Sequence, residues 1–203
     1  MDEFHRIGML LCIEMLFLLY RSEPYRKYHS SWNTWSNPQQ RIDSYSEYAD
    51  EVREWWDKLD PRWAQIRQEA LDLLKREQRL QQIVRLIGPD ALPDTERLIL
   101  VVSEMIKNGF LQQNAFDDID VFSVPEKQIL ILELMIQFYK RSLSVIKQGA
   151  PLMKITNLPV KEEIVRIKTS VANDKINEIS TVESHLEEQL SSLEKIYRRA
   201  DIL

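Results

Sequence analysis

Three acidic residues, Asp117, Asp118 and Asp120, form the densest group of side chains in this 203-residue chain that could bind a cation. A calcium-binding loop of the EF-hand type that begins at Asp117 would need glycine at its sixth position and glutamate at its twelfth. Those positions hold Phe122 and Gln128. We therefore interpret the aspartates as helix caps in a solvated loop, and the sequence predicts no metal site.

Histidine and cysteine, on which much metal binding and nucleophilic catalysis depends, are sparse. The histidines, His5, His29 and His185, lie far apart, and no pair has the spacing of metal ligands. Cys12 is the single cysteine, so an internal disulfide is excluded, and its lack of a neighbouring histidine leaves no nucleophile–base pair. A single cysteine also fits a reducing compartment. We predict no catalytic residue in this chain.

Glycine is also scarce, and this excludes the common phosphate-binding motifs. The four glycines are Gly8, Gly88, Gly109 and Gly149. A P-loop or a dinucleotide-binding fingerprint needs several glycines within a few residues, whereas here none stand closer than about twenty residues apart. The chain has 27 basic and 32 acidic residues, and this acidic balance argues against a nucleic-acid partner because phosphate binding needs a basic excess.

The elements that would position any site begin with an apolar segment, Ile7 to Tyr20, which Glu14 interrupts. Its fourteen residues fall short of the roughly 18–20 that cross a bilayer. Acidic residues precede it and no small-residue cleavage site follows, so it does not resemble a signal peptide. We expect a buried or amphipathic helix, with no membrane span. A loop rich in Ser, Asn, Tyr and Trp, Ser22 to Arg41, completes a first region, residues 1–43.

A long helix is predicted from Asp60 to Ile87. Asp60 followed by Pro61 has the pattern of an N-cap with proline in the first turn. Gly88 and Pro89 end the helix, which would be about 40 Å long. Its apolar seam, with Glu77 as the one polar member, comprises Trp63, Ile66, Ala70, Leu73, Leu80, Val84 and Ile87.

The rest of the chain also has helical periodicity, and no stretch alternates as a strand would. Ser123 to Glu126 combines capping-box spacing with a proline and opens a further helix, which Gly149 and Pro151 end. The apolar centre of that helix is expected at Ile129–Ile136. Three other helices are expected at Leu98–Ile106, Val160–Lys168 and Asp174–Arg199. The predicted fold class is all-α, a helical bundle with short connections and a long C-terminal helix.

Three stretches of sequence carry a family resemblance. They read Gln82-Ile-Val-Arg-Leu-Ile-Gly-Pro-Asp-Ala-Leu-Pro-Asp94, Phe110-Leu-Gln-Gln-Asn-Ala-Phe-Asp-Asp-Ile-Asp120 and Pro125-Glu-Lys-Gln128. Together they resemble the C-terminal part of the catalytic A subunit of archaeal-type and vacuolar-type rotary ATPases. Ser44-Tyr-Ser-Glu-Tyr48 with Trp55-Trp56 is similar to the entry of the same domain. The resemblance is strongest over residues 44–168 and defines a second region, 44–203, whereas residues 1–43 match nothing in that family.

The resemblance implies a helical domain that helps couple ATP synthesis or hydrolysis to ion transport in a rotary complex. It leaves open whether protons or sodium ions move. The chain lacks the P-loop domain, so we do not expect it to be catalytic alone. A second hypothesis is a stand-alone helical adaptor derived from the same family, whose residues 1–43 bind a new partner or self-associate.

The resemblance also assigns two sites. The segment Gly88, Pro89, Asp90, Ala91, Leu92, Pro93 and Asp94 is similar to the loop that approaches the rotor, although an ordinary turn between helices would look the same. Phe116 is similar to the aromatic residue that packs against the adenine ring of the bound nucleotide, and by itself it would read as a core residue.

The remaining expectations concern cofactors, partners and location. This chain alone is expected to hold no cofactor, while the full-length protein of the family uses ATP or ADP with magnesium. The implied partners are the nucleotide-binding domain of the catalytic chain, the neighbouring B subunits and the central rotor stalk, with self-association through residues 1–43 as an alternative. The implied location is cytoplasmic, peripheral to the membrane in the ATPase headpiece.

Overall fold

The computed structural model describes residues 58, 60–112, 119–120 and 123–200. The chain divides into two compact units, Met1–Gln65 and Ile66–Leu203. The described residues form six α-helices and contain no strand, so the predicted all-α class is confirmed. The predictions for residues 1–43 lie outside the described part of the chain.

Helix α3, Trp63–Ile87, is the long helix that the sequence predicts. Asp60 caps its start, because Oδ1 accepts the backbone N–H of Arg62 at 2.9 Å. One face of its second-unit part is buried through Ile66, Ala70, Leu71, Leu73, Leu74, Glu77 and Leu80. The predicted seam is wrong at its end, since Ile87 is 62% exposed. The last turn of α3 is therefore largely exposed, with Leu86 85% exposed as well.

Helix α4, Asp94–Ile106, follows a single 3₁₀ turn, η2, Pro89–Ala91. Its N-cap residue, Pro93, has extended backbone angles. At its other end the helix widens into a π-helical turn, η3, Lys107–Leu111, whose closing hydrogen bond runs from the N–H of Gln112 to the carbonyl of Lys107 at 2.9 Å. Single π-turns are often found next to functional sites.

Helix α5, Pro125–Lys147, is the buried centre of the second unit. The predicted capping box at its start is wrong, because Val124, not Ser123, occupies the N-cap position. The backbone carbonyl of Ser123 accepts a hydrogen bond from Gln128 Nε2 at 2.8 Å. The N–H of Val124 donates to Asn173 Oδ1 at 3.3 Å, which ties the start of α5 to a residue far along the chain.

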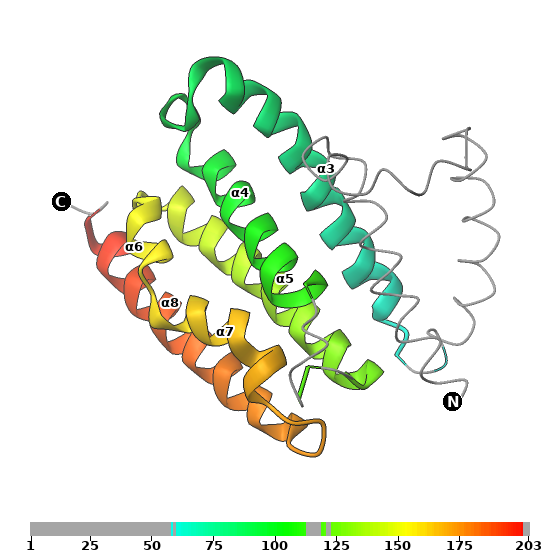
Figure 1. The fold of residues 1–203 in the computed structure, drawn as a ribbon. Coiled ribbons are helices and arrows are strands. Elements are labelled where there is room, and N and C mark those ends of the chain that lie inside the picture. The colour runs from blue at the N-terminus through cyan, green and yellow to red at the C-terminus, as the bar shows by residue number, and fades with distance from the viewer. Residues whose placement is uncertain (1–57, 59, 113–118, 121–122, 201–203) are drawn as a thin grey trace, which may run out of the picture. The chain divides into compact units, whose positions relative to one another are not determined.

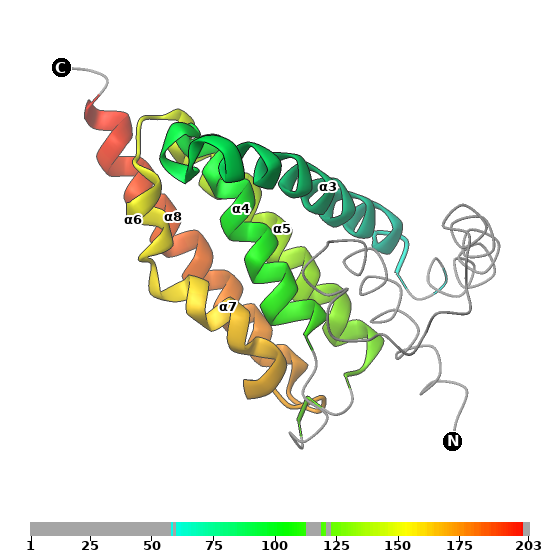
Figure 2. The same cartoon turned by 45° about the horizontal axis from the view of Figure 1, so that its top comes forward.

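Three more helices complete the second unit: α6, Leu152–Thr156, α7, Pro159–Ser170, and α8, Ile179–Ala200, which a 3₁₀ turn η4, Ile176–Glu178, precedes. In Figures 1 and 2, α4 lies beside α5, and α7 lies beside α8. Helix α5 contacts α4, α7 and α8, so its apolar side chains, such as Leu132 and Phe138, are fully buried. No α-helix of the described part has the length and apolar composition needed to cross a bilayer.

Candidate functional site

The turn between α3 and α4, residues Gly88 to Asp94, has a backbone that only glycine adopts easily. Gly88 has φ 85° and ψ 161°, a combination almost restricted to glycine. The N–H of Gly88 still bonds to the carbonyl of Val84 at 2.9 Å, so the chain leaves α3 abruptly after a complete helical turn. The turn exposes Pro89, Asp90 and Ala91 to solvent.

Leu92 and Asp94 anchor this turn from within. Leu92 is buried, and its N–H donates to the carbonyl of Pro89 at 3.2 Å. Asp94 Oδ2 accepts the N–H of Leu152 at 2.8 Å, and Oδ1 pairs with Arg97 at 3.3 Å. The predicted loop is therefore divided in two: an exposed tip, and two residues whose side chains fix the tip to the bundle.

Apolar side chains extend this exposed tip back along α3. Ile83, Leu86 and Ile87 are 41%, 85% and 62% exposed. Three large aliphatic residues exposed within five positions are unusual, and exposed apolar patches often mark interaction sites. The sequence did not reveal this patch, because Ile87 follows the seam spacing and only the packing of the described helices leaves it uncovered.

The second site residue predicted from the resemblance, Phe116, lies outside the described residues, as do Asp117 and Asp118. The described residues on either side are Gln112, which follows η3, and Ile119 and Asp120. Gln112 and Asp120 therefore stand at the two ends of a connection, residues 113–119, and the elements next to them hold these ends.

Turn η3 packs closely on α7 at Gly109. A Cβ atom added to Gly109 would lie 3.0 Å from Val165 Cα, 3.1 Å from Val165 O and 2.8 Å from Met135 Cε. The Val165 atoms belong to the backbone and cannot move aside as a side chain can. Glycine is therefore required here for the close approach of the two helices, not for a positive φ.

Lys168 of α7 binds both ends of the 113–119 connection. Its Nζ donates to the carbonyl oxygens of Phe110 at 3.1 Å and Gln112 at 2.8 Å. The same Nζ lies 3.2 Å from Asp120 Oδ1. The side chains of Lys168 and Asp120 are only 6% and 3% exposed, so solvent screens this ion pair weakly. The interpretation of the aspartates as residues of a solvated loop is therefore wrong for Asp120, because the buried ammonium of Lys168 binds its carboxylate.

The sequence predicts no role for Lys168, although one signal is present in it. Lys168 stands four and eight residues after the buried Ile164 and Val160, and therefore on the apolar face of α7. A lysine in an apolar stripe has to find an acceptor if it is buried. Lys127, which is completely buried on α5, follows the same pattern and donates to the carbonyl of Lys168 at 3.0 Å.

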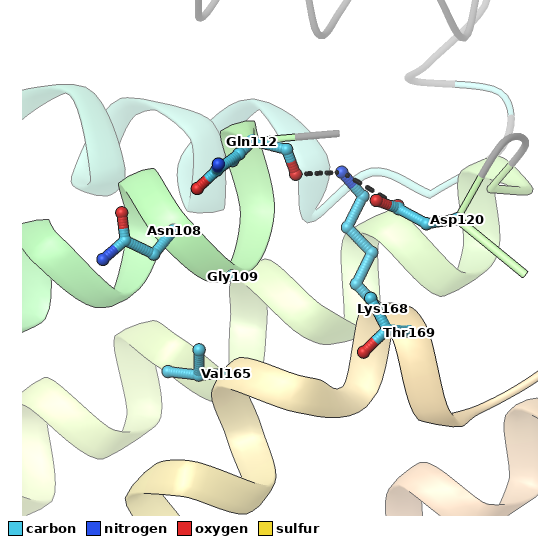
Figure 3. Close-up of a pocket in the computed structure, with 7 residues that line it drawn as sticks. All are labelled: Asn108, Gly109, Gln112, Asp120, Val165, Lys168 and Thr169. Atoms are coloured by element: carbon cyan, nitrogen blue, oxygen red, sulfur yellow. Dashed lines mark hydrogen bonds and ion pairs between the residues drawn. The ribbon is translucent and has the colours of Figure 1, made fainter. Parts of the chain in front are cut away.

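A pocket of about 290 Å³ opens beside this cluster. Figure 3 shows its lining residues, which come from η3, α7 and the end of the 113–119 connection: Asn108, Gly109, Gln112, Asp120, Val165, Lys168 and Thr169. The bonds from Lys168 to Gln112 and Asp120 form its polar wall. The volume is at the lower end of the range of small-molecule sites.

No cluster of three or more histidine, cysteine or acidic side chains in the described part of the chain could hold a metal ion. His185, the one histidine that the structure describes, pairs its Nδ1 with Glu163 Oε2 at 2.8 Å. This contact joins α8 to α7 and has a structural role.

Comparison with known proteins identifies a family that this chain matches. A family model described as the C-terminal domain of V and A type ATP synthase matches residues 53–156. The match includes the turn between α3 and α4, turn η3 and all of α5.

Whole-protein relatives agree with the family match. The chain is 40% identical over 159 residues to the A subunit of the A-type ATP synthase of Pyrococcus horikoshii, covering 78% of this chain and 16% of that protein. It is 43% identical over 157 residues to the corresponding protein of Sulfolobus acidocaldarius, covering 76% of this chain and 26% of the relative. A third relative, the corresponding protein of Desulfurococcus sp., is 43% identical over 134 residues, covering 66% of this chain and 23% of that protein. The chain thus spans about a quarter or less of the length of these relatives.

Proposed function

The chain belongs to the family of the C-terminal domain of V- and A-type ATP synthases, and on this basis we propose that it is the helical, rotor-contacting and adenine-packing part of the catalytic A subunit. In this role it takes part in coupling ATP synthesis or hydrolysis to ion transport by the whole complex. The observation that carries the proposal is the turn from Gly88 to Asp94, which is exposed at its tip and anchored at its base.

A contact that transmits force needs both a surface for the partner and a rigid attachment. The exposed tip, Pro89 to Ala91, and the neighbouring Leu86 and Ile87 supply the surface. The rigid attachment comes from Leu92, which is buried, and from Asp94, which bonds to the start of α6. A displacement of the tip is therefore passed to α4 and α6 and is not absorbed in a flexible loop.

The second proposed site is Phe116, which would pack its ring against the adenine of ATP or ADP. Support comes from the described residues on either side of it. Turn η3 is fixed on α7 through Gly109, and Lys168 binds both Gln112 and Asp120. An aromatic residue carried by such a fixed base can stack on a base at low cost in conformational entropy.

We assign the phosphate and magnesium chemistry to the nucleotide-binding domain of the full-length catalytic chain. The sequence of this chain has no glycine-rich phosphate loop. The partners that follow from this assignment are that domain, the neighbouring B subunits and the central stalk. The proposed location is the headpiece, peripheral to the membrane.

The test is a chimera: a full-length catalytic chain of a relative that carries residues 53–203 of this chain in place of its own C-terminal segment, assembled with its ring and stalk. Replacing both prolines of the turn, Pro89→Gly with Pro93→Gly, removes the restriction on φ at two positions of the turn. We expect ATP binding to persist while the ATP hydrolysed per ion moved, or per rotation, rises. Coupling equal to that of the unsubstituted chimera would refute the rotor role of the turn.

A further inference from the structure

Helices α7 and α8 run antiparallel, and two contacts fix their register. The N–H of Val160 donates to Gln189 Oε1 at 3.2 Å. Further into α7, Glu163 Oε2 lies 2.8 Å from Nδ1 of His185, which stands earlier in α8. Residues that precede Val160 therefore lie beside residues that follow Gln189. In Figures 1 and 2, helix α6, Leu152–Thr156, accordingly lies beside the last turns of α8.

Two large apolar side chains are exposed where α6 lies beside α8. Met153 of α6 is 71% exposed and Ile196 of α8 is 62% exposed. Ile196 follows Gln189 by seven positions, about two helical turns, so both stand on the face of α8 that is directed toward α7. Met153 precedes Val160 by the same number of positions. The antiparallel register therefore brings Met153 and Ile196 to the same level of the bundle.

The exposed charges of these two segments have one sign. In residues 147–157 and 192–198 the exposed charged side chains are Lys147, Lys154, Lys195 and Arg198. Glu194, the one acidic residue of these segments, is only partly exposed, accepts a hydrogen bond from Gln148 at 3.0 Å and lies 3.5 Å from Arg141. Since the chain as a whole has a net charge of −5, this positive charge is a local property. We call Met153, Ile196 and these four cationic side chains the α6–α8 surface.

A third helix is the partner that this surface fits best. Neighbouring helix axes lie about 8–10 Å apart, so a helix laid over α6 and α8 can contact apolar side chains of both. Apolar residues three or four positions apart would give that helix the necessary face. Carboxylates beside this face would meet the cationic side chains of α6 and α8. Binding to a lipid surface depends instead on burial of a whole apolar helix face, and here each helix exposes one large apolar residue.

We propose that the α6–α8 surface docks an acidic amphipathic helix of a partner protein. Met153 and Ile196 form the apolar centre of the contact, and the surrounding cations select an acidic partner and speed its association. This surface uses no residue of the turn from Gly88 to Asp94. Helix α8 also lies outside residues 53–156, which the family model matches. The docking role is therefore separate from the proposed rotor contact and does not depend on it.

The direct test is binding of a fluorescent peptide to the 203-residue chain, measured by fluorescence anisotropy. The probe is a stapled helix of about 20 residues with leucine on one face and glutamate on both flanks. Two matched peptides carry lysine in place of glutamate, or serine in place of leucine. We expect the leucine–glutamate peptide alone to bind, and its affinity to fall as salt is added. Equal binding of the lysine peptide, or no binding of the leucine–glutamate peptide at about 1 mM, would overturn the proposal.

Two double variants locate the bound peptide on the α6–α8 surface. Met153→Ser with Ile196→Ser removes the apolar centre, and Lys154→Glu with Lys195→Glu reverses two of the charges. All four side chains are exposed, so circular dichroism should show an unchanged helix content. We expect each double variant to weaken binding of the leucine–glutamate peptide by about tenfold or more.

Matched controls carry the same kinds of substitution on α3. Ile83→Ser with Leu86→Ser removes two exposed apolar side chains, and Lys75→Glu with Arg79→Glu reverses two exposed charges. We expect both controls to bind the leucine–glutamate peptide as wild type does. A loss of affinity in the controls that equals the loss in the α6–α8 variants would place the peptide elsewhere and overturn the proposal.

Two further measurements distinguish a helix from other occupants of the surface. Vesicles of phosphatidylcholine with phosphatidylserine test a lipid surface, and sedimentation of the chain alone tests a second copy. We expect Met153→Ser with Ile196→Ser to change neither vesicle binding nor the sedimentation coefficient. Vesicle binding that this double variant abolishes, or a dimer that it dissociates, would overturn the proposal in favour of a membrane or of self-association.

Discussion

Glu77 of α3 and Lys107 of η3 form an ion pair in which Lys107 Nζ lies 2.6 and 2.7 Å from the two carboxylate oxygens. The side chain of Glu77 is only 5% exposed, and Gln81 also donates to it. Helix α3 ends in the proposed rotor-contacting turn, and η3 leads into the connection that carries Phe116. The pair therefore links the two elements that bear the proposed sites.

Removing this pair should lower the stability of the second unit. Glu77→Gln leaves Lys107 without its carboxylate, but Lys107 is 30% exposed and regains some solvation. We expect a loss of about 1–2 kcal/mol in the free energy of unfolding, measured by urea denaturation. Combined with Lys107→Met in a double-mutant cycle, the two changes should be clearly non-additive. Additive effects would mean that the pair contributes no coupling between α3 and η3.

Gly109→Ala should destabilise the contact between η3 and α7. The added methyl group meets the backbone of Val165 at 3.0 Å, so the helices must separate or strain. Overpacking of this kind typically costs about 1–3 kcal/mol. Asn108→Ala, at the exposed neighbouring position, is the matched control and should change the thermal midpoint little. A midpoint for Gly109→Ala equal to that of the control would show that the close approach is not needed.

Gly88 should resist replacement for a different reason, since no atom lies within 4 Å of a Cβ placed there. Its backbone, at φ 85° and ψ 161°, is strained for any residue with a Cβ. Gly88→Ala and Gly88→Asn should therefore both cost about 1–3 kcal/mol, although asparagine tolerates the ordinary left-handed region well. Calorimetry of the two variants checks this, and rescue by asparagine alone would contradict the assigned geometry.

The contact between α5 and α8 should weaken in acid through Glu194. A hydrogen bond from Gln148 at 3.0 Å is the largest cause that lowers the pKa of Glu194, burial opposes it, and the charge of Arg141 lowers it further. Because the pKa is lowered in the folded state, the contribution is complete above the ordinary value of 4.5 and is lost as pH falls through the lowered value. The free energies of unfolding of wild type and Glu194→Gln, measured by urea denaturation, should converge as pH falls through this window. A constant difference would contradict the assignment.

The sequence predicts the helices of this chain well and its buried charges poorly. Apolar periodicity and a single stop glycine are enough to locate α3 and α5, because both signals are local. The exposure of Ile87 and the burial of Lys168 depend on which helices end beside them, and this is a property of the tertiary packing. The five-residue helix α6 is too short to give a periodic pattern.

The candidate site residues show the same limit of prediction from sequence. The family resemblance names Phe116 and the turn at Gly88, but it does not indicate what holds either in place. Asp94 looks like one more acidic residue of the loop, whereas its carboxylate bonds to Leu152, fifty-eight positions along the chain. Such contacts between distant segments leave no mark in the local sequence.

The most direct measurement of the central claim is photo-cross-linking from the tip of the turn in the assembled chimera. Ala91→Cys and, as control, Ser192→Cys on the exposed face of α8 each carry a benzophenone in a chimera whose other cysteines are replaced by serine. The account predicts that the label at residue 91 cross-links to the central stalk and the label at residue 192 does not. Cross-links from residue 91 that join only proteins of the ring, or the same products from both positions, would contradict it.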